Sequence, residues 1–291
     1  PPRLLRIAYL SYDWRDHPMG RLTARLVTSH NTSRVAAKSL SYGPDEPNPV
    51  YDFVKQFSPE FRDFSREDSD SKFARAIYGR GSGHEAPHIL VDLVVHTFNG
   101  RIGVPGSRPA PLVLNYLGYP GSSGCKTFDY IVLDSNLAGP MLVPSFSERL
   151  LLLSGPYQSN FLPLHIWPRQ AYSNPSLVGS SSQASLSENL IINITNFRRR
   201  LHPRHIRVCA VNSNKKFEQV SFTAWMNFLR RVPRAVLYVL IDDRDGAKKL
   251  ISHTLYTGIS PQRLVLFSKL DWESHLVRLS GCDLALDTFV Y

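Results

Sequence analysis

The sequence predicts an α/β protein with two domains, the first of them doubly wound. Three observations lead to this prediction: strand-like and helix-like segments alternate along the first half, a stretch without hydrophobic period follows, and the alternation then resumes. The chain has 291 residues and 43% hydrophobic content, which is enough for one large or two ordinary domains with real cores.

Short apolar runs in the first half predict strands of a buried parallel sheet. These runs are RIAYLSY (6–12), RVAAKSLSY (34–42), HILVDLVV (88–95), LVLNYLG (112–118), DYIVLDS (129–135) and ERLLLLS (148–154). An amphipathic run near 19–29 and a helical pattern near 71–80 predict helices between them.

The most informative stretch is RPAPLVLNYLGYPG at 108–121, where a hydrophobic strand meets a turn rich in glycine and proline. Gly118, Gly121 and Gly124 allow the backbone to approach a ligand without interference from a Cβ atom. Parallel sheets bind ligands at such turns, so we expect a ligand here.

A segment rich in Ser, Pro and Gln follows, and it predicts a linker or surface insertion. Beyond it, strands are predicted at 205–213, 235–242, 263–268 and 283–289, and helices at 218–231, near 246–256 and from 272. We therefore divide the chain into a first domain at 1–162, a linker at 163–200 and a second, partial domain at 201–291. Because Tyr291 ends a predicted strand, where a parallel sheet would continue into a binding loop, we expect the chain to be a fragment of a larger protein.

The net charge indicates which classes of binding partner the protein favours, and the cysteine content indicates its cellular compartment. An excess of 34 Lys and Arg over 24 Asp and Glu favours an anionic partner such as a nucleotide diphosphate, an acidic protein or a nucleic acid. Cys125, Cys209 and Cys282 are widely spaced, so we expect neither a disulfide framework nor a zinc site, and a reduced cytosolic or nuclear compartment. No apolar run approaches the ~18 residues of a membrane span, and no signal-peptide layout is present.

The segment after the 112–118 strand comes close to two catalytic sequence motifs but matches neither of them. A phosphate-binding P-loop requires G-x-x-x-x-G-K-[ST], but Cys125 separates Gly124 from Lys126, and Tyr119 stands at the first glycine position. Cys125 also occupies the last position of a G-x-S-x-G elbow around Ser123. Neither an NTPase nor a serine hydrolase is indicated.

Charged groups in the second half have ordinary explanations as well as functional ones. Asp243 and Asp245 follow a strand and could hold a divalent cation, but a solvated turn before a helix is the more economical interpretation. The basic run from Arg198 to Arg207 could contact phosphates, yet it lacks the interleaved aromatics that single-strand binding favours. An exposed interdomain face explains it better.

Position alone singles out two residues. His17 follows the first strand, where Pro18 can open a helix, and an imidazole there can hydrogen-bond a substrate near neutral pH. Lys216 lies between a strand and a helix, where an ammonium and free backbone N–H groups can hold a phosphate. A structural histidine and a surface lysine remain the alternatives.

Several segments together resemble the catalytic region of the O-linked N-acetylglucosamine transferases, glycosyltransferase family 41. The matching segments occur in the family's order: RIAYLSYDWRDHP, HILVDLVVHT, RPAPLVLNYLGYPGSSG, FDYIVLDS, FSERLLLL, VNSNKKF, WMNFLRRVP, ESHLVR and DLALDT. The resemblance implies the GT-B fold, in which two Rossmann-like domains face each other across a cleft, with the second domain truncated here. It also implies inverting transfer of N-acetylglucosamine from UDP-N-acetylglucosamine to Ser or Thr hydroxyls of nuclear and cytoplasmic proteins. No metal or other cofactor, membrane or specific nucleic acid is expected.

The resemblance also assigns residues. His17 matches the histidine beside sugar and acceptor, which has been considered as a base, and Leu117 and Gly118 match backbone that lines the sugar pocket. Lys216 matches the lysine that neutralises the diphosphate, and Asn212 and Ser213 lie in its loop. The remaining pair, His275 and Arg278, matches residues at the nucleotide end.

Departures from the family pattern leave alternatives open. Met19 replaces a small hydroxyl residue, Lys215 replaces an aromatic, and the chain ends before the family's diphosphate-binding loop. A segment with another active-site histidine and the helical repeats that recruit substrates are also missing from the N-terminal side. We therefore expect the isolated chain to be inactive.

The alternatives are a Spindly-type O-fucosyltransferase that uses GDP-fucose, suggested by His96-Thr97, and a degenerate, non-catalytic nucleotide-sugar-binding module. A metal-dependent transferase using Asp243 and Asp245 and a nucleic-acid-binding protein are less favoured.

Overall fold

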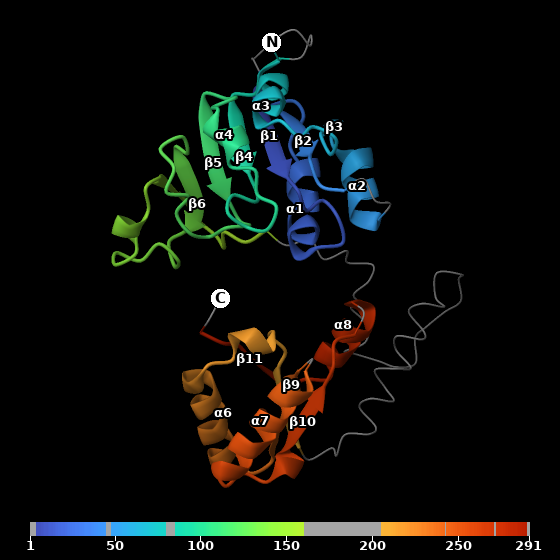
Figure 1. Cartoon of the computed structure of the whole chain (residues 1–291), viewed down its shortest axis with the longest axis vertical. Coiled ribbons are helices and arrows are strands. Elements are labelled where there is room, and N and C mark those ends of the chain that lie inside the picture. Colours follow the sequence, from blue (N-terminus) through green and yellow to red (C-terminus); the bar gives the residue numbers. More distant parts are fainter. Residues whose placement is uncertain are drawn as a thin grey trace, which may run out of the picture. The chain divides into compact units, whose positions relative to one another are not determined.

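The computed structural model describes residues 4–44, 48–79, 85–159, 205–241, 243–270 and 272–289. The chain divides into two compact units, Pro1–Pro163 and Leu164–Tyr291 (Figure 1). The predicted linker at 163–200 lies outside the described residues.

The first unit is a parallel sheet of seven strands in the order β3-β2-β1-β4-β5-β6-β7 (Figure 1). Its strands are β1 (Leu5–Ser11), β2 (Val35–Ser41), β3 (Glu60–Asp63), β4 (Ile89–Asp92), β5 (Leu112–Tyr116), β6 (Tyr130–Asp134) and β7 (Arg149–Leu153). The helices are α1 (Pro18–Thr28), α2 (Pro49–Phe57), α3 (Asp70–Tyr78) and α4 (Gly103–Gly106), with a 3-10 turn η1 at Val143–Ser145. The strand order reverses between β1 and β4, so this is the point where a doubly wound sheet opens for a ligand.

The predicted strands and helices of this half are confirmed, but α2, β3 and the four-residue helix α4 were missed. Asn48 caps α2 by accepting hydrogen bonds from the backbone N–H groups of Val50 and Tyr51, and Pro49 occupies its first turn. Asn-Pro is a regular helix-start signal and could have revealed this helix. The strand β3 is a four-residue edge strand without an apolar pattern, so periodicity could not find it.

The second unit has a parallel sheet of four strands in the order β10-β9-β8-β11 (Figure 1). Its strands are β8 (Ile206–Ala210), β9 (Ala235–Leu240), β10 (Leu264–Phe267) and β11 (Leu284–Leu286). The helices are α6 (Gln219–Arg231), α7 (Arg244–Tyr256) and α8 (Trp272–Ser280), with 3-10 turns η2 at Asn214–Lys216 and η3 at Pro261–Arg263. All predicted elements of this half are confirmed, and the order again reverses, here between β8 and β11.

The cores follow from the strand sequences. In the first unit, Tyr9, Val91, Leu114 and Ile131 are buried at successive central strands. In the second, every residue of β9 is buried, as its uninterrupted apolar run requires.

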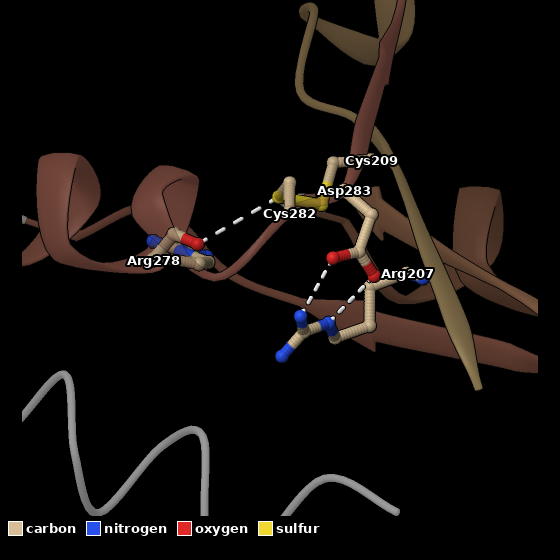
Figure 2. Close-up of a disulfide and its surroundings, with 5 residues drawn as sticks. All are labelled: Arg207, Cys209, Arg278, Cys282 and Asp283. Carbon is tan, nitrogen blue, oxygen red and sulfur yellow. Dashed lines mark hydrogen bonds and ion pairs between the residues drawn. A yellow bond between two sulfur atoms is a disulfide. The ribbon is translucent and has the colours of Figure 1, made fainter. Parts of the chain in front are cut away.

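The cysteines of the second unit contradict the sequence-based expectation. Cys209 on β8 and Cys282, which precedes β11, form a disulfide with Cα atoms 6.0 Å apart (Figure 2). The prediction was wrong because spacing along the chain does not reveal that β11 returns to pair with β8. Arg207 and Asp283 reinforce the same strand pair, because the guanidinium donates to both carboxylate oxygens at 2.9 and 2.7 Å (Figure 2). Cys125 in the first unit is free.

No helix among the described residues is long and apolar enough to cross a membrane.

Candidate functional site

The carboxyl edge of the first sheet holds His17, Leu117 and Gly118. His17 is the N-cap residue of α1, and its Nδ1 accepts a hydrogen bond from the backbone N–H of Met19 at 3.3 Å. The histidine side chain is 39% exposed, which leaves it accessible to a ligand. Local sequence explains the placement, because Pro18 has no N–H of its own to satisfy at the start of the helix.

The ionisation of His17 is set by its surroundings. Burial lowers the pKa of His17; the nearby carboxylate of Asp13 opposes this shift, and the charge of Arg15 adds to it. Asp13 Oδ2 lies 3.6 Å from Nδ1, beyond a good hydrogen bond. A neutral imidazole that accepts at Nδ1 carries its proton on Nε2. The geometry therefore gives His17 a hydrogen-bond donor at Nε2, whereas a general base needs a lone pair there.

Leu117 and Gly118 form the exit from β5. Leu117 is buried with φ +71°, a left-handed conformation that disfavours a branched side chain. A Cβ atom at Gly118 would lie 2.0 Å from the carbonyl oxygen of Leu93 and 3.3 Å from Met19 Cε. Only glycine fits here, and the start of α1 and the ends of β4 and β5 thus meet at one place.

The glycine-rich turn that follows is occupied by the protein's own acceptors. Glu148 accepts the backbone N–H of Ser123 at 2.7 Å and the hydroxyl of Ser122 at 2.8 Å. Burial would raise the pKa of Glu148, but hydrogen bonds from Ser123 and Ser122 outweigh it and hold that pKa below its usual value. His96 Nε2 also hydrogen-bonds the carbonyl oxygen of Ser123 at 2.8 Å. The carboxylate of Glu148 thus uses an N–H group that a phosphate cradle would need, and nothing in the sequence pattern had marked this residue.

A buried carboxyl group supports the neighbouring turn. Asp92, the last residue of β4, is fully buried and accepts the backbone N–H groups of Val94 and Val95 at 2.9 and 3.1 Å. Burial raises the pKa of Asp92 to about 6, although these two hydrogen bonds act against the shift. Val95 has φ +50°, a strained conformation for a β-branched residue. The turn beside Leu93 is thus held in shape by a group that sequence reasoning missed.

The second sheet brings Asn212, Ser213 and Lys216 to its own reversal point. Asn212 follows β8, and its side-chain Nδ2 donates to Asp287 Oδ1 and to Thr288 Oγ1, which follow β11. Ser213 precedes η2, and its carbonyl oxygen accepts the backbone N–H of Lys216 at 2.9 Å. The pKa of Asp287 is lowered by the hydrogen bond from Asn212, by the backbone N–H of Thr288 and by the charge of Lys216. The ammonium group of Lys216 and the hydrogen bond between Asn212 and Asp287 therefore lie at the same carboxyl edge of the second sheet.

His275 and Arg278 lie elsewhere in the second unit, on α8. Arg278 is buried, donates to the carbonyl oxygen of Ser268 at 2.8 Å and stacks on the Phe267 ring at 4.0 Å. Burial lowers the pKa of His275, and the charge of Arg278 adds to that effect. Arg278 is thus fixed to the end of β10, two strands away from β8, and its role toward a nucleotide stays a prediction.

Asp243 and Asp245 have structural partners. Asp243 caps α7 by accepting the N–H of Gly246, and its other oxygen accepts the side-chain amide of Asn214. Asp245 lies 3.5 Å from Lys248 on the same helix. Among the described residues, no group of three or more His, Cys, Asp or Glu side chains could hold a metal ion. The described contacts match a helix-capping turn.

Comparisons with known proteins agree with this architecture. The probable UDP-N-acetylglucosamine--peptide N-acetylglucosaminyltransferase SEC of Arabidopsis thaliana is 24% identical over 284 residues, or 98% of this chain and 27% of the relative. A mutant of Thermobaculum terrenum O-GlcNAc transferase superposes with TM-score 0.76 and 23% identity, covering 99% of this chain and 49% of the other.

A third similarity is to Anabaena HepE in complex with UDP and glucose, with TM-score 0.54, 10% identity and coverage of 97% of this chain and 73% of that one. The fold is therefore that of the GT-B glycosyltransferases. The chain spans about a quarter of the length of SEC and about half that of the Thermobaculum protein.

Glycosyl transferase family 41 matches residues 2–166 and 171–291, nearly the whole sequence, and the chain belongs to that family.

Proposed function

We propose that this chain forms part of a protein O-GlcNAc transferase, which transfers N-acetylglucosamine from UDP-N-acetylglucosamine to Ser or Thr hydroxyls of proteins. The observation that carries the proposal is the placement of family-matching residues at the reversal points of both sheets. His17, Leu117 and Gly118 lie at the first reversal point, and Asn212, Ser213 and Lys216 at the second. Membership in the family and the relatives' names supply the donor and the acceptor class.

The residues divide the chemistry between them. Transfer with inversion places the acceptor hydroxyl in line with the departing diphosphate, so the bond to the anomeric carbon forms as the bond to UDP breaks. The hydroxyl loses its proton late in this step, to a phosphate oxygen of the departing diphosphate or to water. Lys216 neutralises negative charge that develops on the leaving diphosphate, and this stabilises the transition state electrostatically. Lys216 supplies the positive charge that other transferases take from a divalent cation, so we expect activity to withstand EDTA.

His17 acts as a hydrogen-bond donor in this proposal. Its Nε2–H can bind an oxygen of the sugar or the acceptor, while its Nδ1 remains engaged as the cap of α1. Because burial lowers the pKa of His17, the neutral form that makes this bond prevails at physiological pH.

The test uses the full-length protein with both nucleotide sugars. Turnover of UDP-N-acetylglucosamine, abolished by Lys216→Met and kept by Lys215→Met, supports the proposal. Turnover of GDP-fucose alone assigns the protein to the fucosyl branch and refutes our donor. UDP binding in calorimetry without turnover of either nucleotide sugar identifies the non-catalytic nucleotide-sugar-binding module.

The same proposal implies a cellular location and a class of acceptor protein. We propose protein acceptors in the cytoplasm and nucleus, and helical repeats elsewhere in the protein to recruit them. The Cys209–Cys282 disulfide is unusual for those compartments, so its redox state in cells is a direct check. Alkylation before lysis, followed by mass spectrometry, measures that state.

A further inference from the structure

Asp287 is an exposed carboxylate in the second unit that no assignment of the site has used. It directly follows β11, whereas its partner Asn212 follows β8, so one hydrogen bond of 2.5 Å joins the two strands at the reversal point. A second hydrogen bond from the same amide nitrogen reaches Thr288 Oγ1 at 3.2 Å. The backbone N–H of Thr288 in turn donates to Asp287 Oδ1 at 2.8 Å.

This contact determines the orientation of the Asn212 amide. An ionised carboxylate can only accept hydrogen bonds, and the pKa of Asp287 is held below its usual value by the hydrogen bond from Asn212, by Thr288 and by Lys216. The side-chain nitrogen of Asn212 must therefore face Asp287. The amide carbonyl Oδ1 is then the Asn212 atom left to meet a ligand, and it can only accept.

We propose that Asp287 is a positioning residue of the donor site, which orients Asn212 so that its carbonyl accepts a hydrogen bond from a hydroxyl or N–H group of the nucleotide sugar. This inference rests on the proposed function. With this orientation, Asn212 does not bind the diphosphate, because its carbonyl oxygen and the phosphate oxygens repel each other. The carbonyl oxygen is suited to the hydroxyl and N–H groups of the neutral parts of the donor. The diphosphate then depends on Lys216, whose positive charge lies close enough to Asp287 to shift its pKa.

The test compares two substitutions at Asp287 in the full-length protein. Asp287→Ala removes the acceptor, and we expect the KM for the nucleotide sugar to rise about tenfold, since a misoriented Asn212 amide loses one hydrogen bond to the donor, while kcat stays within about twofold. Asp287→Asn keeps an oxygen that can accept from Asn212, so we expect a KM within about threefold of the wild type. Asp245→Ala, which removes an exposed carboxylate from the same unit, is the matched charge control and should leave the KM unchanged.

A double-mutant cycle shows whether Asp287 acts through Asn212. Asn212→Ala should raise the KM by the same factor as Asp287→Ala, and the double variant should be no worse than either single one. Equal losses for Asp287→Asn and Asp287→Ala, additive effects with Asn212→Ala, or no effect of Asp287→Ala each overturn the inference. If Asp287→Ala does not fold, Asp287→Leu, which is close to Asp in size and cannot accept a hydrogen bond, takes its place in both comparisons.

Failure of the proposed function looks different. Lys216→Met should weaken UDP binding whether or not Asp287 orients Asn212. Wild-type UDP affinity in Lys216→Met contradicts the proposed function, whereas lost affinity there with no effect of Asp287→Ala contradicts only the positioning role.

Discussion

Reduction of the Cys209–Cys282 disulfide is expected to destabilise the second unit by about 4.5 kcal/mol. The bond closes a chain segment with a sequence separation of 73. The chain-entropy relation gives a loss of about 15 cal/mol/K for a loop of this size, which is about 4.5 kcal/mol at 25 °C. We expect the reduced folded state to keep the Arg207–Asp283 ion pair and the β8–β11 pairing, so that loss of the bond acts mainly by freeing the unfolded chain.

Hydrogen exchange in urea can isolate this effect, because it is measured peptide by peptide. Peptides from β9, which is buried throughout, report the free energy of unfolding of the second unit. With a urea slope of about 2 kcal/mol/M, reduction should lower the midpoint by about 2 M. Cys282→Ser should reproduce the shift without a reductant.

Cys125→Ser is the control, since Cys125 is a free thiol in the first unit. It should leave exchange in β9 unchanged, and reduction should have its full effect in that background. A change below about 1 kcal/mol on reduction would refute the stabilising role of the bond.

Three further predictions concern the first unit. Gly118→Ala places a Cβ atom 2.0 Å from the Leu93 carbonyl oxygen and should cost at least about 2 kcal/mol in urea unfolding, whereas Gly139→Ala, in open space, should cost little; equal costs would contradict the close approach. Asp92 has a folded-state pKa of about 6, above its ordinary 3.8, so its ionisation lowers the stability of the wild type by about 2.4 kcal/mol as pH rises from 4 to 7. Asp92→Asn should lose that pH dependence while still accepting from Val94 and Val95, and parallel stability–pH curves for the two proteins would count against the burial argument. Glu148→Gln replaces one acceptor oxygen by a donor and should cost about 1–2 kcal/mol, measured by thermal unfolding; an unchanged midpoint would mean that the turn at Ser123 is held by other groups.

The strands were predictable because parallel strands buried on both faces are continuous apolar runs. AVLYVL became β9 and LVLNY became β5 for this reason. The short polar strand EFRD carried no such signal, since its place at the sheet edge depends on pairing with β2. Helix α2 had a local signal in Asn48-Pro49, which hydrophobic periodicity alone does not contain.

The candidate site was predictable only where a residue's position along the chain determines its place in the sheet. His17 and Lys216 each follow the first strand of a doubly wound unit, and such strands end at the reversal point. Glu148 and Asp287 were missed because their roles depend on contacts between distant segments, whereas Asp92 accepts the N–H groups of Val94 and Val95, two and three residues on, and hydrophobic periodicity carries no sign of such a turn. The Glu148–Ser123 bond spans 25 residues and the Asp287–Asn212 bond spans 75. The disulfide escaped prediction for the same reason.

Calorimetric titration of UDP into the full-length protein tests the central claim most directly, with Lys216→Met and Lys215→Met compared to the wild type. Neighbouring lysines of equal charge differ only in their place in the loop, so the comparison separates a phosphate contact from general electrostatics. The account predicts that Lys216→Met weakens UDP binding at least tenfold and that Lys215→Met changes it less than about threefold. Equal affinities for the two variants would contradict the placement of the nucleotide-sugar site at the β8–β11 reversal point.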